Sequence, residues 1–186
     1  MKEQTLPVVN QIIPAKWMKP FLIVWSGQAF SLLGSNLVQF TLVWWLTKTT
    51  GSAIVLTTST LVALLPEVLI GPFAGALVDR WNRKLVMIVA DMAIAFATLI
   101  LAVLYWMGFI QVWQIYVIMF IRSVGTAFHW PSMQASTSLM VPEQQLQRIS
   151  GLNQALRGGL NIVGPPLAAF LLSVIPIAGV LCIDIV

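Results

Sequence analysis

Three ionisable side chains, Glu67, Asp91 and Arg122, lie inside long apolar stretches of the sequence. At the rise of an α-helix, Glu67 is about 18 Å from Asp79, the charged residue that follows its stretch, and Arg122 is about 15 Å into its own stretch. A charge at the centre of a bilayer costs roughly 2.5–3.5 kcal/mol, so such a side chain faces a protein interior, pairs or changes protonation state. Proton transfer is therefore the first chemistry to consider.

Glu67 is the natural proton carrier among these residues. Burial disfavours the charged form of a carboxyl group, whereas a nearby arginine favours it. If Arg122 approached Glu67 in one conformation and withdrew in another, Glu67 would release and take up a proton. Two alternatives stay open. Glu67 could line a polar cleft or bind a substrate without titrating, and Arg122 could be a structural tie to backbone carbonyl groups.

Other polar side chains in the apolar stretches are candidates to line a substrate cavity: Gln28, Asn36, Gln39 and His129. The amides could instead hydrogen-bond between helices. His129 could relay protons, although a packing role within the helix bundle is the plainer interpretation. We expect Asp91 to be structural and to hold Arg80 or Arg83 near the inner membrane surface.

The composition indicates a membrane protein. The chain of 186 residues is 59% hydrophobic and only 9% charged, against about 25% charged residues in soluble domains. The net charge is +4, and the basic residues that produce it lie mostly in the loops between apolar stretches. This distribution argues against a nucleic-acid partner. The single cysteine, Cys182, excludes an internal disulfide and a cysteine-based metal site. The charges are too few for a metal site, and no enzyme motif occurs, so we expect neither an enzyme nor a bound metal.

The apolar stretches predict five membrane-spanning helices and the start of a sixth. Each of the five exceeds the roughly 20 residues that a helix needs to cross the hydrocarbon core, and helices satisfy every backbone group within their own segment. Pro142 is expected to end the fourth helix and to begin a longer link. Because the sixth stretch stops after about two turns, we expect a fragment or a truncated product. The predicted ranges are 21–46, 52–78, 85–107, 112–140, 154–174 and 180–186.

Basic residues predict the orientation of these helices. They are concentrated before the first helix and in alternate loops, whereas Lys48 stands alone on the opposite side. Basic loops stay in the cytoplasm, so we expect a cytoplasmic N-terminal segment over 1–20 and a transmembrane half-bundle over 21–186. The residues on the basic side are Lys2, Lys16, Lys19, Arg80, Arg83, Lys84, Arg148 and Arg157.

A charged turn between the second and third predicted helices carries a family signature. The segment 75–84 reads Gly-Ala-Leu-Val-Asp-Arg-Trp-Asn-Arg-Lys and resembles the loop 2–3 signature of the major facilitator superfamily, G-x-L-x-D-R-x-G-R-K. Asn82 stands where glycine is usual, and asparagine also tolerates a left-handed turn. Arg122-x-x-Gly125 resembles the helix-4 arginine motif of that superfamily. Gly164-Pro165 resembles the core of its helix-5 antiporter motif, although Ala168 and Ala169 replace the glycines that follow.

Shorter segments resemble bacterial macrolide-efflux-type drug exporters in particular, over about residues 20–186. In chain order these segments are Trp25-Ser-Gly27-Gln28-Ala29, Thr50-Gly51-Ser52-Ala53, Gly71-Pro72, Phe120-Ile-Arg122-Ser-Val-Gly125-Thr-Ala-Phe-His129 and Val141-Pro142-Glu143.

The resemblance implies an all-α fold of twelve helices in two six-helix halves, of which this chain is the N-terminal half. It implies efflux of amphipathic small molecules across the bacterial plasma membrane, driven by inward proton flow and without a cofactor. The expected partners are the lipid bilayer, the substrate and the missing C-terminal half. The loop 2–3 charges would latch the cytoplasmic side in one state. The expected latch residues are Gly75, Asp79, Arg80, Arg83, Lys84 and Asp91.

Two alternatives to drug efflux stay open. A transporter of the same architecture could export another cargo, such as a siderophore or a lysolipid. The chain could also be a non-transporting membrane fragment that assembles only with a partner.

Overall fold

The computed structural model describes residues 17–184, which form six helices and no strand. The all-α fold predicted from the sequence is confirmed. Residues 1–16, for which Lys2 and Lys16 were predicted to be cytoplasmic, lie outside the described residues, as do positions 185 and 186. The helices are α1 (Met18–Thr50), α2 (Ala53–Val78), α3 (Arg83–Trp106), α4 (Val112–Met140), α5 (Glu143–Val174) and α6 (Ile177–Ile183).

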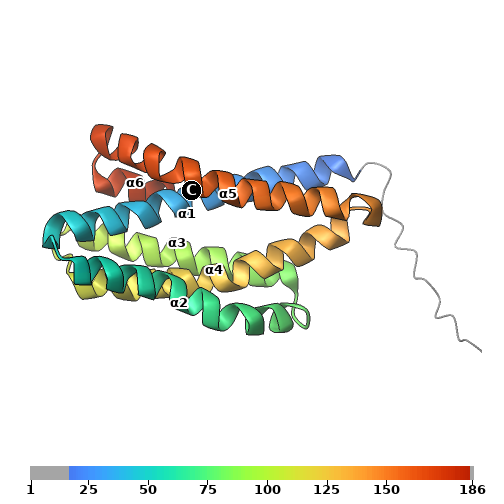
Figure 1. Ribbon diagram of the computed structural model, residues 1–186, viewed down its shortest axis with the longest axis horizontal. Helices are drawn as coiled ribbons and strands as arrows, with labels where there is room; N and C mark the ends of the chain where they lie inside the picture. The colour runs from blue at the N-terminus through green and yellow to red at the C-terminus, as the bar shows by residue number, and fades with distance from the viewer. Residues whose placement is uncertain (1–16, 185–186) are drawn as a thin grey trace, which may run out of the picture.

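The helices pack in two groups. In Figure 1, α1 runs beside α5, while α2 and α3 both pack against α4. The short α6 lies against α3 and α1 and connects the two groups. Four helices, α1, α2, α3 and α5, are long and apolar enough to cross a membrane by length and composition. Helix α4 is not among these four, and it buries more residues than any other described helix, Arg122 and His129 included. Its neighbours therefore shield its polar side chains.

Apolar packing is concentrated towards the ends of the bundle. A large cluster joins α1, α3, α4 and α6 near the α1–α2 turn, with Leu42, Leu101 and Met119 almost fully buried. A smaller cluster at the opposite end contains Phe21 and Ile149. Most of the buried polar side chains lie between the two clusters.

Close approach of α3 and α4 depends on Gly125. A Cβ atom at this position would lie 2.8 Å from Cγ1 of Ile94, which is closer than side chains approach one another. Gly164 on α5 similarly faces Asn36 on α1, where a Cβ atom would lie 3.3 Å from the Asn36 Cβ. Small residues at these contacts let neighbouring helices come together.

Asn82 is the N-cap residue of α3, and it does not adopt the left-handed conformation that asparagine tolerates. Its backbone is extended, with φ of −70° and ψ of 104°, and its side-chain oxygen accepts hydrogen bonds from the backbone amides of Lys84 and Leu85. Asparagine is among the preferred helix N-cap residues because its side chain satisfies amides that lack a partner within the helix. The residue therefore caps a helix here.

Helix α5 begins eleven residues earlier than the predicted Gln154, at Glu143. Pro142 does end α4, but it also stands at the N-cap of α5, because its fixed backbone angle suits a helix start. The polar residues that suggested a loop are good helix formers, and Ile149 packs against Phe21. The expected longer link between the fourth and fifth helices is therefore wrong.

Candidate functional site

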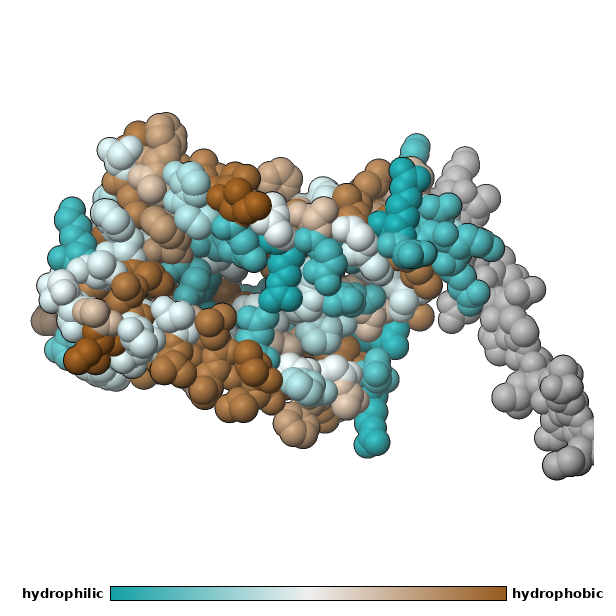
Figure 2. All heavy atoms as spheres, in the orientation of Figure 1, coloured by the Kyte–Doolittle hydropathy of each residue, from teal (hydrophilic) through white to brown (hydrophobic). Residues whose placement is uncertain are grey.

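A polar cavity of about 310 Å³ lies in the middle of the bundle, with walls from α1, α2, α3, α4 and α5. Figure 2 shows hydrophilic side chains around a hollow in this region. The sequence predicted several of the lining residues, and the cavity brings them together. The polar residues in its wall are Ser31, Ser35, Asn36, Gln39, Glu67, Asp91, Arg122, Ser123, Thr126, His129, Arg157 and Asn161.

The most deeply buried charges near this cavity are Arg122 and Asp184. The Nη1 atom of Arg122 contacts Oδ2 of Asp184, and the two side chains are 5% and 2% exposed. Asp184 also accepts hydrogen bonds from the hydroxyl groups of Ser35 at 2.7 Å and Thr98 at 2.9 Å. The pair therefore connects α4 to α1, to α3 and to the residue that follows α6.

Arg122 is not fully satisfied by these contacts. Its Nη2 donates to the backbone carbonyl of Ser35 at 3.2 Å and Nη1 also contacts Thr98, but Nε has no hydrogen-bond partner among the described residues. The residue thus combines an ion pair with the tie to a backbone carbonyl considered from the sequence.

A second ion pair lies at the wall of the cavity, between Glu67 on α2 and Arg157 on α5. The Nη2 atom of Arg157 contacts Oε1 of Glu67, and the guanidinium carbon lies 4.9 Å from the centre of the Trp130 ring. The side chain of Arg157 is 42% exposed and that of Glu67 is 28% exposed. This pair is therefore open to the cavity, in contrast to Arg122 and Asp184.

A third polar group joins α1, α3 and α4 through His129. Its Nε2 atom lies 2.6 Å from Oε1 of Gln28 and 3.3 Å from Oδ1 of Asp91. Since both neighbours offer oxygen atoms, Nε2 suits the role of donor. His129 is 3% exposed, which fits the packing role.

No group of three or more metal-ligating side chains occurs within 17–184.

These contacts change two pairings expected from the sequence. Glu67 is paired with Arg157 and Arg122 with Asp184, so the expected approach of Arg122 to Glu67 is not made in this conformation. Asp91 lies beside His129 and not beside Arg80 or Arg83. Helix rotation decides which faces meet, and residue depth along a helix does not determine that rotation.

The charged turn at the start of α3 is tied to the far end of α4. The Nη1 atom of Arg83 donates to the backbone carbonyl of Ala135 at 2.9 Å, and Arg83 lies 3.8 Å from Asp79. Asp79 is 70% exposed, and Arg80 and Lys84 are also exposed. At Gly75 a Cβ atom would meet nothing within 4 Å.

The remaining candidates occupy less central places. Asn36 lines the cavity and donates to the carbonyl of Leu32 in its own helix at 3.0 Å. Gln28 lies outside the cavity wall, where it contacts His129. Gly164 is buried against α1, and Pro165 lies inside α5.

The sequence interpretation missed Arg157, Trp130 and Asp184 as site residues. Arg157 was assigned to the basic loop, but it is 14 residues into α5, about 21 Å from the start of that helix. Asp184 is the only charged residue after Arg157. A carboxylate within an apolar stretch was the available signal for Asp184, as it was for Glu67.

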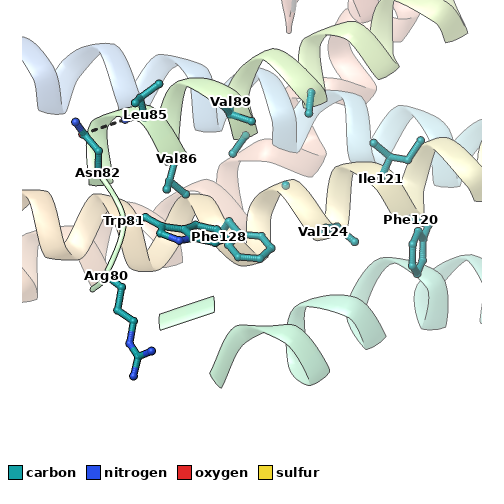
Figure 3. A pocket seen from close by; sticks show the side chains of 13 residues that line it. Arg80, Trp81, Asn82, Leu85, Val86, Val89, Phe120, Ile121, Val124 and Phe128 are labelled. Atoms are coloured by element: carbon teal, nitrogen blue, oxygen red, sulfur yellow. Dashed lines mark hydrogen bonds between the residues drawn. The ribbon is translucent and has the colours of Figure 1, made fainter. Parts of the chain in front are cut away.

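A larger cavity of about 820 Å³ lies between α3 and α4 beneath the charged turn, and it has a different character. Trp81 and Phe128 both line it, and Figure 3 shows Arg80 projecting away from the other labelled side chains. Its lining is apolar except for Arg80 and Asn82, and Asn82 is engaged as a helix cap. It has few polar groups to orient a ligand. The polar cavity is therefore the candidate site.

Long apolar helices around buried polar groups define a multi-pass membrane protein. Residues 24–186 match the Major Facilitator Superfamily, and the chain belongs to this superfamily. It is 42% identical over 169 residues to macrolide efflux protein A of Streptococcus pyogenes, a match that covers 91% of this chain and 42% of that protein.

Two further relatives agree with this assignment. Macrolide efflux protein A of Enterococcus faecalis is 44% identical over 135 residues, covering 73% of this chain and 42% of that protein. The uncharacterised MFS-type transporter YfiS of Bacillus subtilis is 26% identical over 120 residues, or 64% of this chain and 28% of that protein. The chain thus spans less than half the length of these relatives. No solved structure matches it significantly.

Proposed function

We propose that this chain is the N-terminal half of a proton-coupled exporter of amphipathic small molecules, of the multidrug or macrolide type, and not an enzyme. The names of two relatives support the cargo class. The single observation that carries the transport proposal is the buried pair of Arg122 and Asp184 in an apolar bundle. Buried charges of this kind are costly in membranes and mark ion and proton pathways.

Proton coupling in this proposal uses the network around Asp184. Its side chain contacts Arg122 on α4, Ser35 on α1 and Thr98 on α3. Protonation of Asp184 would neutralise one member of the pair and release Arg122. Because Arg122 and Glu67 line the same cavity, Glu67 stays the second candidate carrier. The proton gradient serves as the energy source.

The latch role is proposed for the turn between α2 and α3. Arg83 anchors this turn to α4, while Asp79 is left exposed to solvent or to a second half-bundle. Making and breaking such contacts as two halves rock would bias the transporter towards one state. A C-terminal half-bundle is the partner that this role requires.

Basic residues support an orientation in the bacterial plasma membrane with the N-terminus in the cytoplasm. The start of α1, the α2–α3 turn and the start of α5 lie at one end of the bundle, and the end of α1 lies at the other (Figure 1). Lys19 and Arg148 belong to the first end, and Lys48 belongs to the second. Basic residues are retained on the cytoplasmic side of membranes.

Transport in inverted membrane vesicles tests this proposal. The native gene product is expressed in a bacterial host, and accumulation of a labelled macrolide is followed with the vesicle interior made acidic. We expect uphill accumulation that a protonophore abolishes. Accumulation that persists without a proton gradient would overturn proton coupling, and no accumulation above empty vesicles would favour the non-transporting alternative.

Variants then identify the carrier. Asp184→Asn and Glu67→Gln are compared with Arg148→Gln, which removes an exposed charge from α5. A carrier variant should keep downhill flux, measured at saturating macrolide and per amount of folded protein, and lose gradient-driven accumulation, whereas the Arg148 variant should keep both.

A further inference from the structure

Glu67 and Trp130 converge on a single positive charge. The carboxylate on α2 contacts the guanidinium group of Arg157 from α5, and the same guanidinium lies 4.9 Å from the centre of the Trp130 ring on α4. A carboxylate and the face of an indole ring are both groups that proteins use to hold a cation. The geometry is therefore that of a cation site whose occupant is a residue of the chain itself.

The occupant is held loosely enough to be displaced. The side chain of Arg157 is 42% exposed, and it lines the cavity together with Glu67 and Trp130. The sealed pair of Arg122 and Asp184, which is 5% and 2% exposed, offers no such access.

We propose that Glu67 and Trp130 bind the positively charged group of an amphipathic cation, and that this ligand displaces Arg157. The inference rests on the proposed export of amphipathic molecules and specifies the charge of the cargo. The cavity also offers an apolar wall from Leu32, Leu64 and Leu160, against which the apolar body of such a ligand would lie.

The exchange keeps Glu67 paired with a positive charge, because one cation replaces another. Arg157 remains in the cavity and moves its charge into the open part, so the cavity gains the charge of the ligand. An anionic cargo would instead bind Arg157 directly. The two cases predict opposite effects of removing Arg157, which makes the site testable.

The experiment measures equilibrium binding to the native gene product in lipid nanodiscs without any gradient. The probes are a labelled quaternary ammonium amphiphile and its uncharged isostere, in which carbon replaces nitrogen. Arg157→Gln should tighten binding of the cation about fivefold, because it removes the competing charge. Glu67→Gln should weaken binding about tenfold, and Trp130→Leu about fivefold.

Two controls separate a binding role from a structural one. The uncharged isostere should bind all variants equally, and Arg148→Gln should bind both probes as the unmodified protein does. The double variant Glu67→Gln with Arg157→Gln leaves no unpaired charge, and it should bind the cation as weakly as Glu67→Gln alone.

Weaker binding of the cation to the Arg157 variant, or unchanged binding to the Glu67 variant, would overturn the inference. Because no gradient is present, the result does not depend on proton coupling. Gradient-driven macrolide transport without any preference for the charged probe would reject this cation site and leave the proposed function intact.

Discussion

Arg122 and Asp184 are 62 residues apart in the sequence, and they form an ion pair that is almost completely sealed from solvent. Asp184 follows the shortest helix of the bundle, and the pair secures that helix to α4, with Ser35 of α1 and Thr98 of α3 as further partners. An uncompensated buried charge is strongly destabilising. Each side chain of this pair therefore compensates the buried charge of the other.

Replacing Asp184 by asparagine is expected to destabilise the protein by about 3–5 kcal/mol, because it leaves Arg122 buried without a counter-ion. Denaturant unfolding in detergent micelles measures the loss. Asp79→Asn is the matched control, since Asp79 is 70% exposed and its replacement should change stability little. Addition of Arg122→Gln should restore part of the loss. Equal stability of the two aspartate variants would contradict the prediction.

Replacing Gly125 by alanine should weaken packing of α3 on α4. The new Cβ atom would lie 2.8 Å from Cγ1 of Ile94, and overpacking of this kind costs about 1–3 kcal/mol. Thermal unfolding is the measurement, with Gly71→Ala as control because that site has open space. Combining Gly125→Ala with Ile94→Ala should give a smaller loss than the sum of the single changes, since the two residues are in contact. Additive losses would show that the contact is not the cause.

Replacement of Asn82 by another helix-capping residue should preserve the stability of the protein, whereas replacement by alanine should lower it. Loss of the side-chain acceptor in Asn82→Ala is expected to cost about 1 kcal/mol, whereas Asn82→Asp should be nearly neutral and Asn82→Gly should cost a few tenths of a kcal/mol. Hydrogen exchange at the Lys84 and Leu85 amides, which donate to Asn82, reports the change locally. Unaltered protection of these amides in the alanine variant would argue against the cap.

Replacement by glutamine should lower the transport rate at Arg83 but not at Arg80. Arg83→Gln removes a charged donor to the carbonyl of Ala135, and such hydrogen bonds contribute about 1.5–3 kcal/mol. That energy would shift the balance between conformations by roughly tenfold or more. Initial transport rates in vesicles should therefore fall for Arg83→Gln and stay close to the unmodified rate for Arg80→Gln, which is exposed. Equal transport rates in the two variants would contradict the proposed latch role of the α2–α3 turn.

The existence and extent of most helices followed from the sequence. The predicted range of the fourth helix coincides with α4, Val112–Met140, and the other boundaries before Pro142 differ by no more than four residues. A helix satisfies all the backbone hydrogen-bonding groups of its own segment within lipid, so the extent of an apolar stretch between charged turns indicates the extent of a helix. The start of α5 was missed because its first turns are polar, and only their packing against α1 distinguishes them from a loop.

Charged residues at membrane depth were also evident from the sequence alone, but their partners were not. Glu67, Asp91 and Arg122 were recognised as charges at membrane depth, yet each contacts a residue that depth along a helix did not indicate. Pairing depends on how each helix is rotated and which helices are neighbours, and both are set by packing over the whole bundle. The sequence by itself therefore determined the helices and the candidate charges, and only the tertiary structure decided that Arg122 meets Asp184 while Glu67 meets Arg157.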